Sequence, residues 1–265
     1  MIHITSPEGR VNPIRAESVQ SASEPRRTSA ILIIWGLMPV SHAHRFIFIH
    51  VPKAGGLSMM EAFRSAGIVL EYDGRGLWAA FGSHPGGAQL LARFRRAFKI
   101  APLTSFQQQH LPAGVLRELL PKAVWATYFK FGFVRNPWDL LVSIYHYLKH
   151  RATAPEHQQR NPDIHELIRR SPDFDSYVRL CSLQLTDLGA LLYDDEGNNL
   201  MDFVGRYERI EEDFASVCRK IGVDIALPHL NRSEHAKYRD YYTAETKAIV
   251  SNIFARDIER FGYEF

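Results

Sequence analysis

Continuous apolar runs alternate along the chain with segments in which apolar residues recur every three or four positions. The runs at 45–51 and 128–134 are rich in β-branched and aromatic residues, which is typical of strands buried on both faces of a parallel sheet. Residues 202–208 are expected to form a third core strand. Residues 194–199 combine acidic residues, Gly and Asn between two extended segments, which predicts a hairpin turn.

Helical spacing follows each predicted strand, and punctuating residues mark several helix ends. Asn136 is a suitable N-cap before Pro137 at a first helical position, and Gly67 and Gly222 end two other helices. Strands that alternate with helices predict an α/β fold with a mainly parallel sheet. The expected helices run from the turn at 53–58 to Gly67 and over 112–120, 138–149, 164–170, 173–180, 211–221 and 244–261.

Composition bounds the class of protein. With 265 residues, 46% hydrophobic residues and a net charge of +3, the chain is long enough for one large core and is not a disordered, collagen-like or disulfide-built protein. So small a net charge does not suggest nucleic-acid binding, although a local basic pocket for an anion remains possible. Cys181 and Cys218 are too few and too far apart for a metal cluster, so we expect buried thiols in a reducing, cytoplasmic compartment.

The N-terminal residues differ from the rest of the chain. Residues 1–30 lack periodicity and are rich in Ser, Pro, Glu and Arg, which predicts disorder, and the apolar run at 31–40 is about half as long as a bilayer span requires. Three interpretations stay open: a signal peptide, a loose tail, or an extension upstream of a natural start at Met38, which we prefer. We therefore expect residues 1–43 to be a disordered or non-native extension and residues 44–265 to be a single domain, with no integral membrane span.

The turn that joins the first strand to its helix has the composition of an anion-binding site. Residues 52–58 read Pro-Lys-Ala-Gly-Gly-Leu-Ser, and the glycines allow the backbone N–H groups at a helix N-terminus to approach an anion. Lys53 adds a point charge and Ser58 a hydroxyl donor. The order differs from a Walker A loop, in which the lysine follows the glycines, so a kinase or ATPase is disfavoured.

A second cationic position lies where the next predicted strand ends. Arg135 carries paired donors suited to a terminal phosphate, and Ser143 follows eight residues later, about two helical turns away. Two anion sites on adjacent strands suit a nucleotide with phosphates on both sides of its ribose. The alternative is that Arg135 only caps the helix and pairs with Asp139.

These segments resemble the sulfotransferases that use 3′-phosphoadenosine 5′-phosphosulfate (PAPS). Residues 48–58 look like their 5′-phosphosulfate loop and residues 131–143 are similar to their 3′-phosphate segment, in the branch that includes heparan 2-O- and chondroitin or dermatan sulfotransferases and many bacterial relatives. Residues 202–208, 227–233 and 261–263 also look like that branch. Ala54 and Leu57 depart from it, since the family often has threonine there, but both positions can act through backbone N–H groups.

The resemblance implies a P-loop-NTPase-like three-layer fold, PAPS as sulfuryl donor and PAP as product, no metal, and a hydroxyl acceptor, which we expect to be a carbohydrate. It assigns the donor to residues of the two strand-to-helix junctions and of a loop near the C-terminus that closes over the nucleotide. The expected donor-binding residues are Lys53, Ala54, Gly55, Gly56, Leu57, Ser58, Arg135, Ser143, Ser233 and Lys237. For Ser233 and Lys237 an ordinary surface loop is an equally good interpretation.

Two residues are expected to carry the transfer itself. Lys53 would stabilise the charge that grows on the leaving bridging oxygen, and the resemblance places the base at His110, within a Gln-His-Leu-Pro segment. The alternative for His110 is a helix-capping role, and His50 is expected to be a hydrogen-bonded core residue. Arg206 and Glu208 end the third strand, where an ion pair between them would orient the site.

Two other functions are weighed against a sulfotransferase. A nucleotide kinase would use the same kind of fold, and a non-catalytic relative would bind sulfated or phosphorylated glycans through the same basic cleft. A base beside the lysine argues against a mere binder, since binding needs no base. The sequence names neither the acceptor nor the oligomeric state: Arg75, Arg93, Arg95 and Arg96 could meet an acidic sugar or form a solvated face.

Overall fold

A four-stranded sheet with helices on both faces organises the chain. The structure is a computed structural model, in which the described residues are 37–38, 40–70, 72–73, 85–86, 89, 110–153, 162–182, 189–228 and 237–265. The predicted N-terminal extension up to residue 36 and the arginines between 75 and 96 lie outside these ranges.

The sheet is mainly parallel, as predicted. Its strand order is β2 (Val40–Ser41), β3 (Phe46–Ile49), β5 (Phe129–Val134) and β6 (Phe203–Arg206). The pairs β3/β5 and β5/β6 are parallel, and β2 is antiparallel to β3. Because the parallel strands share one direction, their carboxyl ends meet at one edge. A separate short pair joins β1 (Leu37–Met38) to β4 (Tyr72–Asp73).

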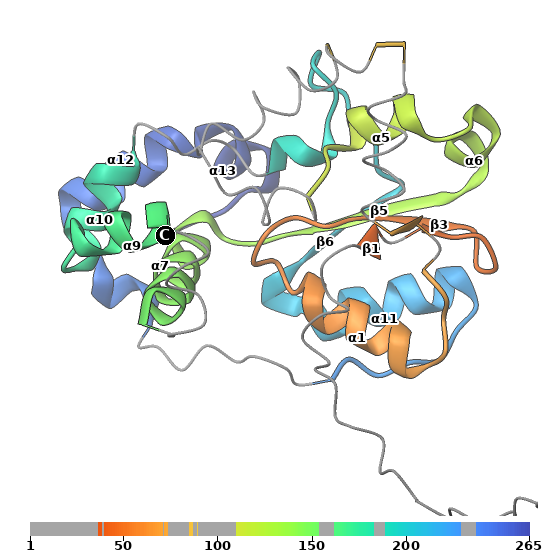
Figure 1. Cartoon of the computed structure of the whole chain (residues 1–265), viewed down its shortest axis with the longest axis horizontal. Coiled ribbons are helices and arrows are strands. Elements are labelled where there is room, and N and C mark those ends of the chain that lie inside the picture. The colour runs from red at the N-terminus through yellow and green to blue at the C-terminus, as the bar shows by residue number, and fades with distance from the viewer. Residues whose placement is uncertain are drawn as a thin grey trace, which may run out of the picture. The chain divides into compact units, whose positions relative to one another are not determined.

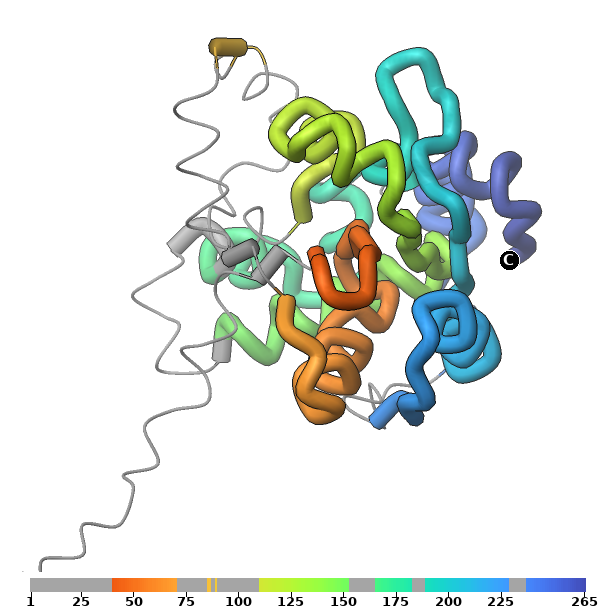
Figure 2. Tube along the Cα trace, turned by 90° about the vertical axis from the view of Figure 1, so that its right-hand side faces the viewer, coloured from red at the N-terminus to blue at the C-terminus, as the bar shows by residue number. Residues whose placement is uncertain are grey.

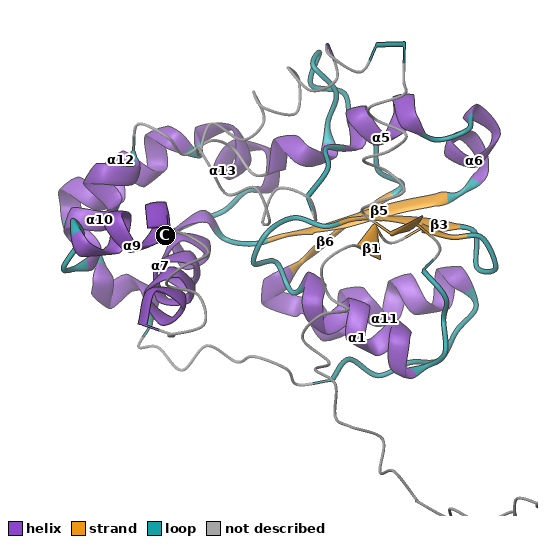
Figure 3. Cartoon of the chain, in the orientation of Figure 1, coloured by secondary structure: helices purple, strands orange, loops and turns teal. Residues whose placement is uncertain are grey.

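Helices cover the two faces of this sheet. In Figures 1 and 2, α1 and α11 lie on one face and α5 and α6 on the other, and Figure 3 shows that α7, α9, α10 and α12 gather beyond one end of the strands. Of these helices, α6 was not predicted. The bounds are α1 Gly56–Ser65, α5 Ala113–Leu119, α6 Lys122–Thr127, α7 Pro137–Thr153, α9 Pro162–Arg169, α10 Phe174–Cys181, α11 Ile210–Ile221, α12 Ala244–Ile253 and α13 Ala255–Phe261, with 3₁₀ helices η1 Gly189–Leu192, η2 Tyr207–Arg209 and η3 Tyr238–Tyr241.

Aromatic side chains fill the space between the sheet and its helices. Phe48 of β3 and Phe131 of β5 stack with ring centroids 5.0 Å apart, and Phe63 of α1 packs against Phe46 at 5.1 Å. All four rings are almost completely buried. Burial on both faces explains why these strands appear in the sequence as continuous apolar runs.

Local signals placed several helix ends correctly. Asn136 caps α7, because its Oδ1 accepts from the backbone N–H of Trp138 at 3.1 Å, and Pro137 is the first helical residue. Gly222 ends α11 in the left-handed region, with φ 73°. Cys181 and Cys218 are both buried and unpaired, as expected.

Three predicted elements differ from the structure. The third strand stops at Arg206, because the chain turns into η2 there and Asp213 accepts from the Arg206 backbone N–H. The closing helix is divided at Phe254, which lets Asp257 of α13 accept from the backbone N–H of Gly189. The turn at 194–199 is present, but its flanks pair only through one bridge, Tyr193 to Asn199, because η1 immediately precedes it.

Within the described ranges, no helix combines the length and apolar character that a membrane crossing requires. Val40 and Ser41, at the end of the expected extension, pair with Ile47 and Phe46 of the sheet.

Candidate active site

The turn between β3 and α1 presents the start of α1 at the carboxyl edge of the sheet. Gly55 is the N-cap, in the left-handed region with φ 85°, and it has no side chain that could cap the helix. The first N–H groups of a helix have no intrahelical partner, so this end suits an anion. Ala54 and Ser58 are buried, and Leu57 is exposed.

Both glycines of the turn are required by close neighbours. A Cβ at Gly55 would lie 2.1 Å from Ile210 Cδ1, and a Cβ at Gly56 would lie 2.0 Å from Cδ2 of the His50 ring. Gly55 also needs its positive φ, which L side chains rarely adopt. The turn is therefore packed closely against α11 below and His50 beside it.

Lys53 is held in a strained and partly buried position. Its φ is 59°, which is uncommon for a residue with a side chain. Its Nζ lies 4.6 Å from the centroid of the Tyr147 ring on α7, a cation–π contact. Burial, with a smaller effect of the Arg135 charge, lowers the pKa of Lys53 to about 8. The ammonium is therefore still charged at neutral pH, but it is poorly solvated.

Arg135 joins the two strand-to-helix junctions. Its Nε donates to Asp139 Oδ2 at 2.8 Å, its Nη1 donates to the backbone oxygen of Lys53 at 3.0 Å, and its guanidinium lies 4.0 Å from the Tyr207 ring centroid. The ion pair with Asp139 that the sequence suggested is thus present. A guanidinium has five N–H donors, and the described contacts of Arg135 use two of them, which leaves three for a ligand.

One face of α7 connects these two cations. Asp139, Ser143 and Tyr147 are spaced by four residues and therefore lie on the same face of the helix. Since Asp139 binds Arg135 and Tyr147 lies under Lys53, the buried Ser143 is between the two contacts. The sequence analysis did not identify Tyr147, although its position eight residues after Asp139 places both on one face of the helix.

A third cation lies at the far end of this face. Arg151 Nη1 donates to the Tyr147 hydroxyl at 2.6 Å, and its guanidinium carbon is 5.5 Å from the Tyr147 ring centroid. Tyr147 therefore lies in contact with Lys53 on one side and Arg151 on the other. Arg151 follows Tyr147 at the same four-residue spacing, but the sequence analysis did not single it out.

His110 lies directly before α5, next to the end of β3. It is buried, and its Nδ1 is 2.7 Å from the backbone oxygen of His50. A carbonyl oxygen can only accept, so Nδ1 carries the proton and Nε2 carries a lone pair. Burial lowers the pKa of His110 to about 4, and the bond to His50 offsets this only in part. The imidazole is therefore neutral at physiological pH.

His50 is buried, as predicted. The hydrogen bond that was predicted for its side chain is not found at Nδ1. Its Nδ1 is shielded from solvent and has no hydrogen-bond partner among the described residues. Its ring centroid lies 4.4 Å from that of His110, and the ring packs against Gly56. Burial, then unfavourable electrostatic interactions with His110 and Lys53, lowers the pKa of His50 well below its usual value. The ring lies between the turn and the candidate base.

Glu208 holds the connection between β5 and α7 through contacts that the sequence did not predict. Its Oε1 accepts from the backbone N–H of Asn136 at 2.5 Å, and its Oε2 accepts from the Tyr263 hydroxyl at 3.4 Å. The expected ion pair between Arg206 and Glu208 is not formed: the Arg206 guanidinium donates instead to the backbone oxygen of Phe261. The C-terminal segment, rather than an ion pair, holds this end of the site.

The remaining predicted residues are not joined to this group. Lys237 is exposed at the start of η3, and no described hydrogen bond or ion pair connects it to the turn. Ser233 lies outside the described residues. Across the described part of the chain, no three His, Cys, Asp or Glu side chains gather as metal ligands.

The geometry thus brings Lys53, His110, Arg135 and Ser143 to one edge of the sheet, around a helix N-terminus. In a comparison with known proteins, the model of the sulfotransferase family, Sulfotransfer_2, matches residues 38–264. The chain belongs to the sulfotransferase family.

One relative of unassigned function is also similar. An uncharacterized protein of Archaeoglobus fulgidus is 30% identical over 133 residues, which cover 49% of this chain and 98% of that protein. No protein of solved structure matches the chain.

Proposed function

We propose that the protein transfers a sulfuryl group from PAPS to a hydroxyl of a carbohydrate acceptor. The observation that carries this proposal is a neutral His110, oriented by the carbonyl of His50, whose own ring lies within the electrostatic influence of the cationic Lys53. Such a pair supplies a base for the acceptor and a charge for the leaving group. The membership in the sulfotransferase family supports the reaction type.

The residues present fit a donor with two anionic ends. The uncapped start of α1 would hold the 5′-phosphosulfate through the backbone N–H groups of residues 54–58, with the Ser58 hydroxyl beside them. The remaining donors of Arg135 and the hydroxyl of Ser143 would bind the 3′-phosphate. Ser233 and Lys237 are proposed as further contacts of the nucleotide. When bound, PAPS supplies the activated sulfuryl group.

The transfer would be an in-line displacement. His110 would accept the proton of the acceptor hydroxyl at Nε2 as the acceptor oxygen bonds to sulfur. Lys53 would stabilise the negative charge on the bridging oxygen as its bond to sulfur breaks. Tyr147 and Arg135 would keep Lys53 in place, through its ammonium and its backbone oxygen respectively. No step requires a metal ion.

The fold type, the domain bounds and the cellular compartment are part of the same proposal. We expect the fold to be of the P-loop-like three-layer type, residues 44–265 to be one sulfotransferase domain, and the protein to act in the cytoplasm. The helices on both faces of a mainly parallel sheet support the first assignment, and the two buried, unpaired cysteines support the last.

Ligand-dependent melting tests the donor. PAP should raise the melting temperature of the protein in the presence of a chelator, because a ligand that binds only the folded state stabilises it. Stabilisation by ATP with magnesium, and none by PAP, would contradict the proposal and indicate a nucleotide kinase. Radiolabelled PAPS with a panel of carbohydrates and small hydroxyl compounds then tests the acceptor. Transfer to none of the carbohydrates would overturn that part.

A further inference from the structure

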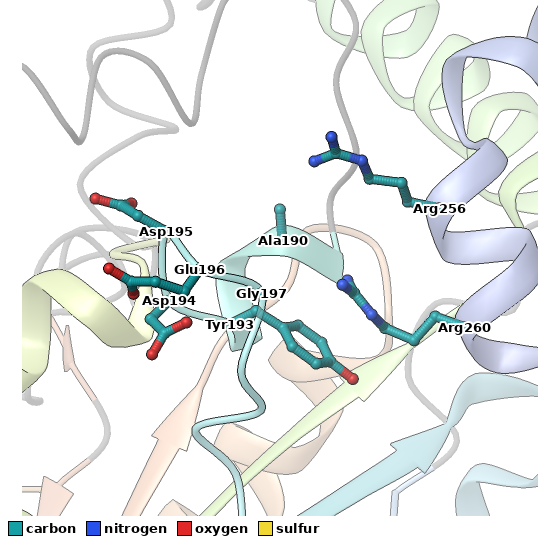
Figure 4. A pocket seen from close by; sticks show the side chains of 8 residues that line it. All are labelled: Ala190, Tyr193, Asp194, Asp195, Glu196, Gly197, Arg256 and Arg260. Carbon is teal, nitrogen blue, oxygen red and sulfur yellow. The ribbon is translucent and has the colours of Figure 1, made fainter.

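A cavity of about 390 Å³ lies between η1, the turn after it and α13, and it contains none of the residues assigned to sulfuryl transfer. This volume is within the range of small-molecule sites. Its walls are mostly polar and charged, as Figure 4 shows. A site with these walls favours a polar, charged ligand over an apolar one.

One wall carries two arginines. Arg256 and Arg260 are four residues apart on α13, so they share a helix face, and Figure 4 shows both side chains extending from this helix toward the cavity. Neither guanidinium forms a hydrogen bond or ion pair with any described residue. The Arg260 guanidinium lies 3.7 Å from the Tyr193 ring centroid, which restrains it while leaving its N–H groups available. Two adjacent positive charges that have no counterion among the described residues suit an anionic group.

The opposite wall is acidic and is built on a well-ordered turn. Asp194 fixes this turn, since its Oδ1 accepts from the backbone N–H of Asn198 at 2.8 Å, and it is 3.6 Å from Arg117 of α5. Glu196 follows at the tip of the turn and is exposed. Its carboxylate forms no hydrogen bond or ion pair with described residues. The acidic wall therefore presents an uncompensated charge as well.

The two walls are close but do not neutralise one another. A Cβ at Gly197 of the turn would lie 3.9 Å from Arg260 Nη2, yet among the described contacts no ion pair joins Arg256 or Arg260 to Asp194 or Glu196. Opposite charges that face each other across a cavity without pairing suit a ligand that carries both signs. A ligand with a single charge would complement one wall and meet repulsion at the other.

We propose that this cavity binds a small zwitterionic ligand that bears an ammonium group and a phosphate or carboxylate. The guanidinium groups of Arg256 and Arg260 hold the anionic group, and the Glu196 carboxylate holds the ammonium group. This assignment rests on the cavity alone and is independent of the proposed sulfuryl transfer.

Calorimetric titration with three matched probes tests the proposal. Glucosamine 6-phosphate carries both charges, glucose 6-phosphate lacks the ammonium group, and glucosamine lacks the phosphate. We expect glucosamine 6-phosphate to bind about tenfold more tightly than either of the others, since each charged contact contributes on that order. Absence of binding by glucosamine 6-phosphate, or equal binding of glucose 6-phosphate, would overturn the proposal.

Variants place the ligand. Arg256→Gln with Arg260→Gln should weaken glucosamine 6-phosphate binding about tenfold or more, and Glu196→Gln should remove its advantage over glucose 6-phosphate. Arg219→Gln, an exposed arginine on α11, is the matched control and should change nothing. Binding that survives the paired arginine change but is lost in Arg135→Gln would put the phosphate at the proposed donor site between β5 and α7 instead and refute the cavity as the site.

Discussion

The Nδ1 of His110 donates to the backbone oxygen of His50 across 2.7 Å, and this bond orients the imidazole. The acceptor belongs to the residue that directly follows β3, so the sheet edge itself fixes the ring. The bond also sets the tautomer that keeps the lone pair on Nε2. In the proposed mechanism, a base with this tautomer needs no further deprotonation at neutral pH.

Replacing His110 by alanine should lower kcat by about 10² to 10⁴, the usual contribution of a positioned general base. Donor binding should remain, because the described hydrogen bond of His110 goes to the carbonyl of His50, which lies outside residues 52–58. Sulfuryl-transfer rates and PAP melting shifts measure the two effects separately. His150→Ala on the exposed end of α7 is the matched control. A variant that retains full kcat would exclude His110 as the base.

The pH dependence of kcat/KM for the donor should be a broad plateau with limbs near 4 and 8. In the proposed mechanism His110 acts in its neutral form, and its pKa is lowered to about 4, so activity should be lost only below that pH. Lys53 would act in its charged form, and its pKa is lowered to about 8, so activity should fall as the pH rises through that value. Initial rates over pH 3.5 to 9.5 measure both.

The donor supplies an internal check on this assignment. Bound phosphates favour charged Lys53, so the alkaline limb of kcat should lie at a higher pH than that of kcat/KM. An acid limb near 6.5, the ordinary histidine value, would indicate an exposed histidine as the titrating group.

Tyr147 should position Lys53 through its ring rather than its hydroxyl. Tyr147→Leu removes the cation–π contact at 4.6 Å and should lower kcat/KM by up to about tenfold, whereas Tyr147→Phe keeps the ring and should remain close to the native protein. The alkaline limb of the pH profile distinguishes this role from a purely structural one. It should shift in Tyr147→Leu and stay in place in Tyr147→Phe, whereas a purely structural role would leave it in place in both variants. Equal losses in both variants would assign the effect to the hydroxyl and its bond from Arg151.

The sequence predicted the parts of the site that depend on local signals. Continuous apolar runs located β3 and β5, because both are covered on both faces. The glycines of the turn, Asn136 and Pro137 located the two helix starts that face the same edge. Parallel strands then bring Lys53 and Arg135 together, since their carboxyl ends coincide, and the bond between these residues at 3.0 Å agrees with that reasoning.

The missed features depend on contacts between residues far apart in the chain. Glu208 bonds to the backbone of Asn136 across 72 positions, and it can do so because the strand bends into η2 after Arg206. Phe254 fits the helical apolar spacing on both sides of it, so spacing alone could not show that the closing helix divides there. His50 lies in an apolar run, which indicated its burial but not that its ring would fill the space beside Gly56.

The contact between His50 and Gly56 predicts a coupled pair of substitutions. Gly56→Ala places a Cβ 2.0 Å from the His50 ring and should destabilise the fold by about 1 to 3 kcal/mol, the usual cost of overpacking. His50→Ala empties the same space, so the double variant should be more stable than the sum of the two single effects by about 1 kcal/mol or more. Urea unfolding of the four proteins gives the coupling energy, and Gly56→Ala combined with His150→Ala, an exposed residue near the end of α7, should be additive. Additivity of the His50 and Gly56 effects would mean that the ring can move aside, and that the glycine is needed for the approach of an anion instead.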